Sequence, residues 1–199
     1  MGLGGRAHPA KLFVHPAILN LAERVALFSS VKALTSTTEP VPVGLSTFNE
    51  TVRRFGSLAV QKGLTFEAAD LPAVRVLGDT KLLQLLLEEV LGNSLHYTRA
   101  GGVVVEVADA PDFVEVSVRD TGVGVTAGEI EHLCDEFFRG VQAKQLYPQG
   151  TGLGLTIARE IVQWCGGSIR VEGCACQGLR VQINLRKEVR SGSNTDRGG

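Results

Sequence analysis

Three glycines at alternate positions open a predicted helix late in the chain, in the segment Gly150-Thr151-Gly152-Leu153-Gly154-Leu155. A glycine destabilises a helix interior by about 1 kcal/mol relative to alanine, so this spacing needs a reason. Close approach to a phosphate is one such reason, because the free N–H groups and the dipole of a helix N-terminus attract anions. Helix packing is the alternative. The segment matches neither the dinucleotide-binding fingerprint nor a Walker loop.

A second glycine-rich segment, Asp120-Thr121-Gly122-Val123-Gly124, directly follows a predicted strand that ends at Arg119. A carboxylate at the end of a strand can accept a hydrogen bond from an exocyclic amine, which is worth ~1.5–3 kcal/mol in a cleft. Gly122 and Gly124 allow the backbone to approach the same ligand closely. The alternative is a turn that uses Asp and Gly for its geometry.

A leucine-rich helix, predicted from Thr80 to about Tyr97 with Asp79 as its N-cap, carries Glu89 and Asn93 four residues apart. This spacing puts the two side chains on one helical face. A carboxylate and an amide oxygen on one face suit Mg²⁺, which takes hard oxygen ligands. Glu89 could also polarise a water molecule or a hydroxyl group. Plain solvation of the glutamate is the alternative.

The segment Asp135-Glu136-Phe137-Phe138-Arg139 lies between the two glycine-rich segments and precedes a polar stretch. Two aromatic residues followed by arginine predict a mobile flap, from which Arg139 or Lys144 reaches a phosphate. The alternative is that the aromatic pair anchors a short helix to the core.

The periodicity of apolar residues predicts helices and short strands along most of the chain. Proline and polar residues predict a linker over 35–42. Ser46 or Thr47 is the expected N-cap of the second helix, with Glu50 as its capping-box partner. Residues 143–150 are expected to be irregular. The expected helices are 11–34, about 47–61, 80–97, 129–138 and 153–165, and the expected strands are 64–69, 74–77, 103–108, 113–119, 168–172 and 179–185. These elements predict an α+β architecture with a mainly antiparallel sheet.

Charge and hydropathy argue against two classes of partner. The chain has 20 basic and 21 acidic residues and a formal net charge of −1, so we expect no general attraction to nucleic acid or to an anionic membrane. No apolar run approaches the roughly 18 residues that span a bilayer, and no secretory signal is visible. We therefore expect a cytoplasmic chain that makes no membrane contact.

The order of these motifs resembles the ATP-binding catalytic domain of sensor histidine kinases, within the larger ATPase family shared with gyrase, a heat-shock chaperone and a mismatch-repair ATPase. The N box, first glycine box, F box and second glycine box of that family resemble residues 91–98, 120–124, 137–139 and 150–155. The resemblance covers about 43–185. It implies a two-layer α/β sandwich, in which helices cover one face of a mixed, mainly antiparallel sheet (the Bergerat-type ATP-binding fold).

The resemblance also implies roles for single residues. Asn93 would help to hold Mg²⁺ on the phosphates of ATP, Asp120 would accept a hydrogen bond from the adenine amino group, and Tyr97 would lie near the nucleotide. Residues 139–150 would form a lid over ATP. The other implied nucleotide contacts are Gly122, Gly124, Arg139, Lys144, Gly150, Thr151, Gly152, Leu153 and Gly154.

Two residues depart from the kinase pattern. Glu89 stands where many histidine kinases carry asparagine, and where the ATP-splitting relatives carry a glutamate that activates water. Glu136 stands where many kinases have a basic residue, which leaves Arg139 as the expected phosphate contact. The implied catalytic residues are therefore Glu89, Asn93 and Arg139, and ATP hydrolysis stays open.

The resemblance implies a phosphoacceptor histidine, but His8, His15, His96 and His132 all lie in unsuitable sequence contexts. Residues 11–42 resemble the second helix of a dimerisation hairpin and its linker, between a disordered start (1–10) and a catalytic domain over 43–187, with a disordered tail over 188–199. We expect either a fragment of a longer kinase or a chain that acts on a partner. The implied partners are a phosphoacceptor domain and a response regulator, in cis or in trans, and a second copy through the N-terminal helix.

Two hypotheses of different classes follow. The first is a kinase domain that transfers the terminal phosphoryl group of Mg-ATP to a histidine elsewhere. The second is a nucleotide-sensing interaction module, or a slow ATPase, without its own phosphoacceptor.

Overall fold

The computed structural model describes residues 16–174 and 178–188. Within these ranges, five strands form a sheet in the order β2-β4-β5-β7-β6, in which β2 runs parallel to β4 and the other neighbours are antiparallel. These strands are β2 (Thr65–Ala68), β4 (Gly102–Asp109), β5 (Phe113–Asp120), β6 (Ser168–Gly173) and β7 (Leu179–Arg186). A separate antiparallel pair joins β1 (Val41–Gly44) to β3 (Arg75–Gly78).

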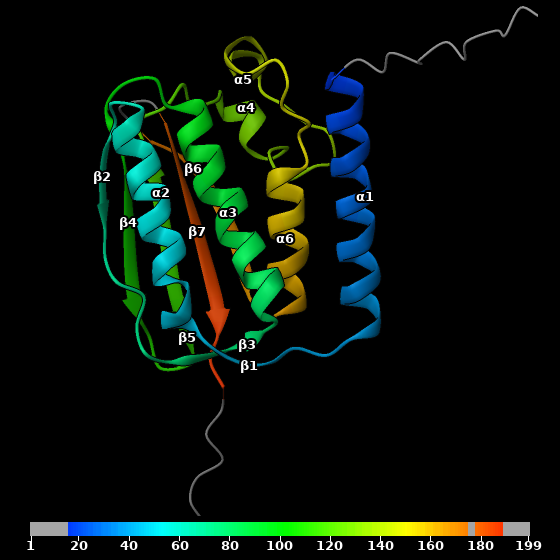
Figure 1. Ribbon diagram of the computed structural model, residues 1–199, viewed down its shortest axis with the longest axis vertical. Coiled ribbons are helices and arrows are strands. Elements are labelled where there is room, and N and C mark those ends of the chain that lie inside the picture. Colours follow the sequence, from blue (N-terminus) through cyan, green and yellow to red (C-terminus); the bar gives the residue numbers. More distant parts are fainter. Residues whose placement is uncertain (1–15, 175–177, 189–199) are drawn as a thin grey trace, which may run out of the picture.

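Helices cover one face of the larger sheet (Figure 1). They are α2 (Asn49–Gln61), α3 (Thr80–Tyr97) and α6 (Gly154–Trp164), while α1 (Pro16–Thr37) lies beside α6, and α4 (Ala127–Ile130) and α5 (Val141–Leu146) lie at one end of the molecule. Leucine and valine side chains of α3, isoleucines of α6 and valines of β5 are buried in one core, and α1 packs along the outer side of α6. The predicted two-layer sandwich is confirmed.

The chain places the ends of two helices at one end of the sandwich. Asp79 caps α3 as predicted, because its Oδ1 accepts hydrogen bonds from the backbone N–H groups of Lys81 (2.8 Å) and Leu82 (3.0 Å). The C-terminal end of α3 and the N-terminal end of α6 then lie close to α4 and α5 (Figure 1). This end of the molecule therefore gathers the motifs that the sequence spreads over about 90–155.

The predicted cap of α2 is wrong. The helix begins at Asn49 after a 3₁₀ turn, and its N-cap residue, Phe48, makes no capping hydrogen bond through a side chain. Leu45 and Phe48 are both buried, and their packing fixes the 3₁₀ turn. The helix therefore begins after this turn, and neither Ser46 nor Thr47 caps it. The Asn49 side chain instead brackets Leu71, accepting from its N–H at 2.7 Å and donating to its carbonyl at 3.2 Å.

The predicted linker over 35–42 is largely wrong, since α1 continues to Thr37 and β1 begins at Val41. The hydroxyl groups of Thr37 and Thr38 donate to carbonyls one turn earlier, which gives these polar residues partners inside the helix end. Pro42 fits into β1 because, among the described residues, β1 pairs on one side only. The predicted start of this helix at Lys11 and both predicted disordered termini, except Glu188, lie outside the described residues.

The flap region also differs from its prediction. The helix expected over 129–138 ends at Ile130, and residues expected to be irregular form α5. One carboxylate explains both helix starts: Glu129 accepts from the Thr126 N–H through Oε2 and from the Val141 N–H through Oε1, each at 2.9 Å. Phe137 then breaks the expected helix with a left-handed φ of 63°.

Candidate functional site

A cavity of about 380 Å³ opens at the end of the sandwich where α3, β5, the 139–150 segment and α6 meet. Most of the residues predicted for the site line it: Glu89, Asn93, Tyr97, Asp120, Gly124, Arg139, Gly150, Thr151, Gly152 and Gly154. Three predicted residues lie outside the lining. Leu153 is buried in the core, Lys144 is exposed on α5, and Gly122 lies behind the Asp120 carboxylate.

Asp120 is fixed at one end of the cavity by its own backbone surroundings. Its Oδ1 accepts hydrogen bonds from the N–H groups of Gly122 (2.8 Å) and Leu179 (3.2 Å). The residue is 7% exposed, and burial raises the pKa of its carboxyl, although the two backbone hydrogen bonds oppose that shift. Among the described residues, no hydrogen bond goes to Oδ2, so this oxygen can accept from a ligand.

Gly122 is required here for close packing. A Cβ on this residue would lie 2.8 Å from Asp120 Oδ1 and would also overlap the Tyr97 carbonyl. That carbonyl, at the end of α3, accepts a hydrogen bond from the Val123 N–H at 3.1 Å. The first glycine-rich segment is therefore joined directly to the helix that carries Glu89 and Asn93.

Glu89 and Asn93 occupy the other end of the cavity, against the start of α6. A Cβ on Gly154 would lie 2.9 Å from both Glu89 Oε2 and Asn93 Nδ2. The Glu89 carboxylate is paired with Arg24 of α1, whose Nη1 donates to Oε1 at 2.7 Å and whose Nη2 donates to Oε2 at 2.6 Å. Arg24 also lines the cavity.

The 139–150 segment is held together by Arg139. Its Nη1 donates to the Pro148 carbonyl at 3.1 Å, and its Nη2 donates to the carbonyls of Ala143 (3.0 Å) and Tyr147. The guanidinium therefore organises the segment from within, whereas the sequence predicted that it would contact phosphate.

Tyr147 is the aromatic side chain of this segment that covers the cavity. It stacks on His96 with 4.6 Å between ring centroids and meets the edge of Tyr97 at 6.4 Å. Burial lowers the pKa of His96, Lys62 adds to that shift, and Glu89 opposes it. His96 is thus favoured as a neutral ring in the stack.

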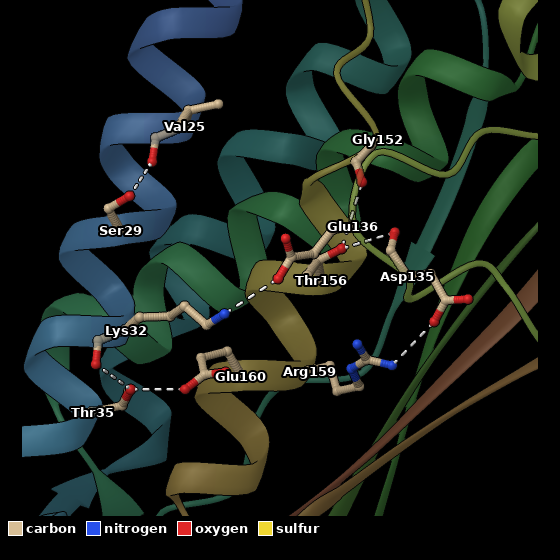
Figure 2. A network of polar contacts seen from close by, with 10 residues as sticks. All are labelled: Val25, Ser29, Lys32, Thr35, Asp135, Glu136, Gly152, Thr156, Arg159 and Glu160. Atoms are coloured by element: carbon tan, nitrogen blue, oxygen red, sulfur yellow. Dashed lines mark hydrogen bonds and ion pairs between the residues drawn. The ribbon is translucent and has the colours of Figure 1, made fainter.

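Gly152 and Phe137 form a tight backbone contact beside the cavity. Gly152 has a φ of 74°, and a Cβ on it would lie 2.6 Å from the Phe137 carbonyl carbon. The Phe137 N–H donates to the Gly152 carbonyl at 3.2 Å. Thr156 supports the same junction from α6, since its hydroxyl donates to the Asp135 carbonyl at 3.2 Å (Figure 2).

Residues 78–189 match the family model described as "Histidine kinase-, DNA gyrase B-, and HSP90-like ATPase". The chain belongs to this family. The predicted resemblance is thereby confirmed, and the two glycine-rich segments around the cavity fall inside the matched range.

Curated relatives of this ATPase-family chain include a sensor histidine kinase and a virulence sensor protein. The sensor histidine kinase RcsC of Escherichia coli strain K12 is 33% identical over 140 residues, which cover 69% of this chain and 15% of RcsC. The virulence sensor protein BvgS of Bordetella bronchiseptica is 34% identical over 155 residues, covering 74% of this chain and 12% of BvgS. The chain therefore spans less than a fifth of these relatives.

Solved structures of the family share the fold. Full-length ShkA in complex with AMPPNP matches with a TM-score of 0.68 and 26% identity, covering 86% of this chain and 36% of that one. A nucleotide-free catalytic domain of the histidine kinase ThkA matches with a TM-score of 0.61 and 24% identity, covering 75% of this chain and 99% of that one.

The donor set suits a metal ion that arrives with a nucleotide. Within residues 16–174 and 178–188, no group of three or more His, Cys, Asp or Glu side chains could hold a metal alone. Asn93 nevertheless presents an amide oxygen at this end of the cavity, beside the Glu89 carboxylate that Arg24 holds. Mg²⁺ takes hard oxygen ligands and is often bound together with substrate phosphates, so Asn93 fits an ion that arrives with a nucleotide. Also within these ranges, no helix has the length and apolar character needed to cross a membrane.

Sequence reasoning missed several parts of the site. Asn20 and Arg24 of α1 line the cavity, although they lie far from every motif in the sequence. Leu179 contributes a backbone N–H, which no side-chain pattern reveals. His96 also lines the cavity, next to Tyr97. The sequence did offer a signal for it, because it lies directly before Tyr97 at the end of a predicted helix.

Proposed function

We propose that this chain binds Mg-ATP and forms the catalytic part of a two-component sensor histidine kinase, passing the terminal phosphoryl group to a histidine on a separate segment or partner. One observation carries the proposal: a single cavity joins the buried Asp120 carboxylate to the glycine-rich start of α6. The family match and the sensor kinases among the relatives support the same activity.

Recognition of adenine would fall to Asp120. Oδ1 is held by two backbone N–H groups, and Oδ2 is free to accept from an exocyclic amine. Because the carboxylate is nearly buried, that bond is made in a low dielectric and favours adenine over a base that presents a carbonyl there.

Binding of the phosphates would fall to the opposite end of the cavity. Asn93 would hold Mg²⁺, which neutralises charge between the phosphates. Backbone N–H groups at the start of α6 would donate to phosphate oxygens. Phosphoryl transfer depends mostly on positioning and charge neutralisation, and these groups supply both.

Partners of this activity are also part of the proposal. The reaction needs a phosphoacceptor histidine domain and a response regulator, in cis or in trans, and would take place in the cytoplasm. Helix α1 exposes the apolar side chains of Ile18, Leu19, Leu21, Val25 and Leu34. This helix is where we expect a second copy to pack, and light scattering against protein concentration would test that expectation.

Two measurements test the proposal. Calorimetric titration of the chain should detect ATP binding that Mg²⁺ strengthens. Labelled ATP, incubated with the chain and candidate acceptor domains, should then give label on an acceptor, and Asn93→Ala should abolish this transfer. Acid-labile phosphate on the purified chain alone would contradict a separate acceptor.

A nucleotide-sensing module is the second candidate, and α1 provides the observation that favours it. Asn20 donates to the Gln149 carbonyl at 3.1 Å, so α1 contacts the 139–150 segment directly. If bound nucleotide reorders this segment, the position of α1 would change, and with it the set of proteins that α1 can bind. Binding of ATP without label transfer to any acceptor would favour this candidate.

A further inference from the structure

An ion pair connects α1 to the phosphate end of the cavity across 65 residues of sequence. Both Glu89 oxygens are engaged by Arg24, and the two side chains are only 24% and 11% exposed. Bidentate pairs of this kind are the strong class of charge-assisted hydrogen bond. The neighbouring pair, Arg54–Glu88, is more exposed, at 53% and 32%.

Glu89 has the chemistry and the place of a general base. A carboxylate within reach of a water molecule can take its proton as the water attacks phosphorus, which typically accelerates a reaction by about 10²–10⁴-fold. Glu89 lines the cavity next to Asn93 and the start of α6, where the terminal phosphate of a nucleotide is expected. Each of its two oxygens already accepts a hydrogen bond from the guanidinium, which fixes the orientation of the carboxylate and competes with a water molecule for the same oxygens.

We infer that Arg24 is a positioning residue that restrains Glu89, and thereby keeps the terminal phosphoryl group of ATP for a protein acceptor instead of water. The inference rests on the proposed function. In the reaction that Arg24 suppresses, the water oxygen forms a bond to the terminal phosphorus and the bond from that phosphorus to the ADP oxygen breaks. The proton of the water passes to the Glu89 carboxylate, and the products are ADP and inorganic phosphate.

The docking of α1 keeps Arg24 in place. Phe28 and Val31 are buried against the core. Along the same helix, Lys32 pairs with Glu136 at 3.2 Å, and the Thr35 hydroxyl donates to Glu160 of α6 at 2.9 Å (Figure 2). Release of Glu89 therefore requires α1 to move or Arg24 to change.

Phosphate release at saturating Mg-ATP, measured on the whole chain, tests this role. Arg24→Ala should raise the rate by about tenfold or more, approaching the contribution of a positioned general base. Arg24→Lys keeps the charge without the two-bond geometry and should give an intermediate rate. The gain should disappear in the double variant Arg24→Ala with Glu89→Gln.

Arg54→Ala is the matched control, because it breaks the pair of the adjacent residue, Glu88, on the same helix. It should leave phosphate release unchanged. Arg24→Gln replaces Arg24→Ala if the alanine variant does not melt cooperatively.

Three results would overturn the role of Arg24: a wild-type rate in an Arg24→Ala chain that binds ATP, a gain that survives Glu89→Gln, or an equal gain in Arg54→Ala. None of these three results contradicts the proposed function. Failure of the wild-type chain to bind ATP in calorimetry would overturn the proposed function, and this inference with it.

Discussion

The two ends of the cavity are built in different ways. At the Asp120 end, backbone N–H groups fix the carboxylate, one from Leu179 of the adjacent strand β7 and one from Gly122 in the loop that follows β5. At the Glu89 end, the groups come from α1, α3 and α6, and the charged side chains are paired with one another. The first end is preformed by the backbone around it, whereas the geometry of the second depends on how the three helices pack.

Under the proposed function, this difference assigns recognition of the nucleotide to the Asp120 end and control of its reaction to the Glu89 end. A carboxylate held by backbone contacts keeps its geometry whatever α1 does. A carboxylate held by an arginine from another helix depends on where that helix lies. We therefore expect changes near Asp120 to affect affinity, and changes near Glu89 and the 139–150 segment to affect what happens to the bound nucleotide.

The largest effect is expected from Gly152→Ala, which attacks the junction at the phosphate end. The substitution places a residue with a side chain at a φ of 74° and 2.6 Å from the Phe137 carbonyl carbon. Left-handed strain and overlap together should lower the free energy of unfolding by about 3 kcal/mol or more, measured in urea.

Gly63→Ala is the control for that change, because its φ is 75° and no atom lies within 4 Å of the added Cβ. It should cost about 1–2 kcal/mol from strain alone. Equal losses of unfolding free energy in the two variants would show that the contact between Gly152 and Phe137 is not tight. The contrast drawn between the two ends of the cavity would then lose support.

Asp120→Asn attacks the preformed end. A neutral amide oxygen accepts more weakly from an exocyclic amine than a carboxylate does, so ATP affinity should fall by up to the ~1.5–3 kcal/mol of a charged hydrogen bond, or about 10- to 150-fold. Calorimetry measures the loss. Asp112→Asn makes the same chemical change at an exposed turn and should bind ATP normally. Equal affinities for the two variants would contradict recognition by Asp120.

The same substitution predicts a pH dependence of stability. Burial raises the pKa of Asp120, so the folded chain holds this proton more tightly than the unfolded chain does. This contribution to stability is present below the unfolded pKa and is lost as pH rises through the folded pKa. The stability of Asp120→Asn relative to wild type should therefore rise across that window in melts from acid to neutral pH, and a difference that falls instead would contradict a raised pKa.

Tyr147→Ala tests the cover over the cavity. Loss of the stack on His96 should remove about 0.5–1.5 kcal/mol. Hydrogen exchange over 141–147 should speed up several-fold, while exchange near Asp120 stays unchanged. Tyr147→Phe keeps the ring and should behave as wild type. Faster exchange at both ends would show that they are not independent.

The smallest effect is expected from Lys32→Ala. The Lys32–Glu136 pair is about half exposed on both sides, and exposed pairs contribute about 0–1 kcal/mol. Thermal melting should barely change. A loss well above 1 kcal/mol would mean that this contact, and not the buried face of α1, holds the helix.

The sequence predicts the preformed end better than the other. Asp120, Gly122 and Gly124 lie together in the chain, so the sequence shows them as one motif. The sandwich is predictable for a related reason, because the periodicity of α3 and the hairpin spacing of β4 and β5 are local features. Arg24 gives no local signal, and only the folded chain brings it to Glu89.

The errors at the flap have a physical reason as well. The apolar and charged pattern after Ile130 favours a longer helix, but the contact between Phe137 and Gly152 imposes a left-handed residue there. Glu129 also accepts a hydrogen bond from the Val141 N–H at the start of α5, whereas the sequence pattern leaves this carboxylate in solvent. Tertiary contacts overrode local preference at both places.

The central claim is that one cavity binds adenine at Asp120 and phosphates at the start of α6. Titration of the isotope-labelled chain with Mg-ATP, followed by NMR of its backbone amides, tests this claim most directly. Saturable shifts are expected at Gly122 and Leu179 together with Gly150, Gly152 and Gly154. Saturable binding that leaves these amides unchanged, or the absence of binding, would contradict it.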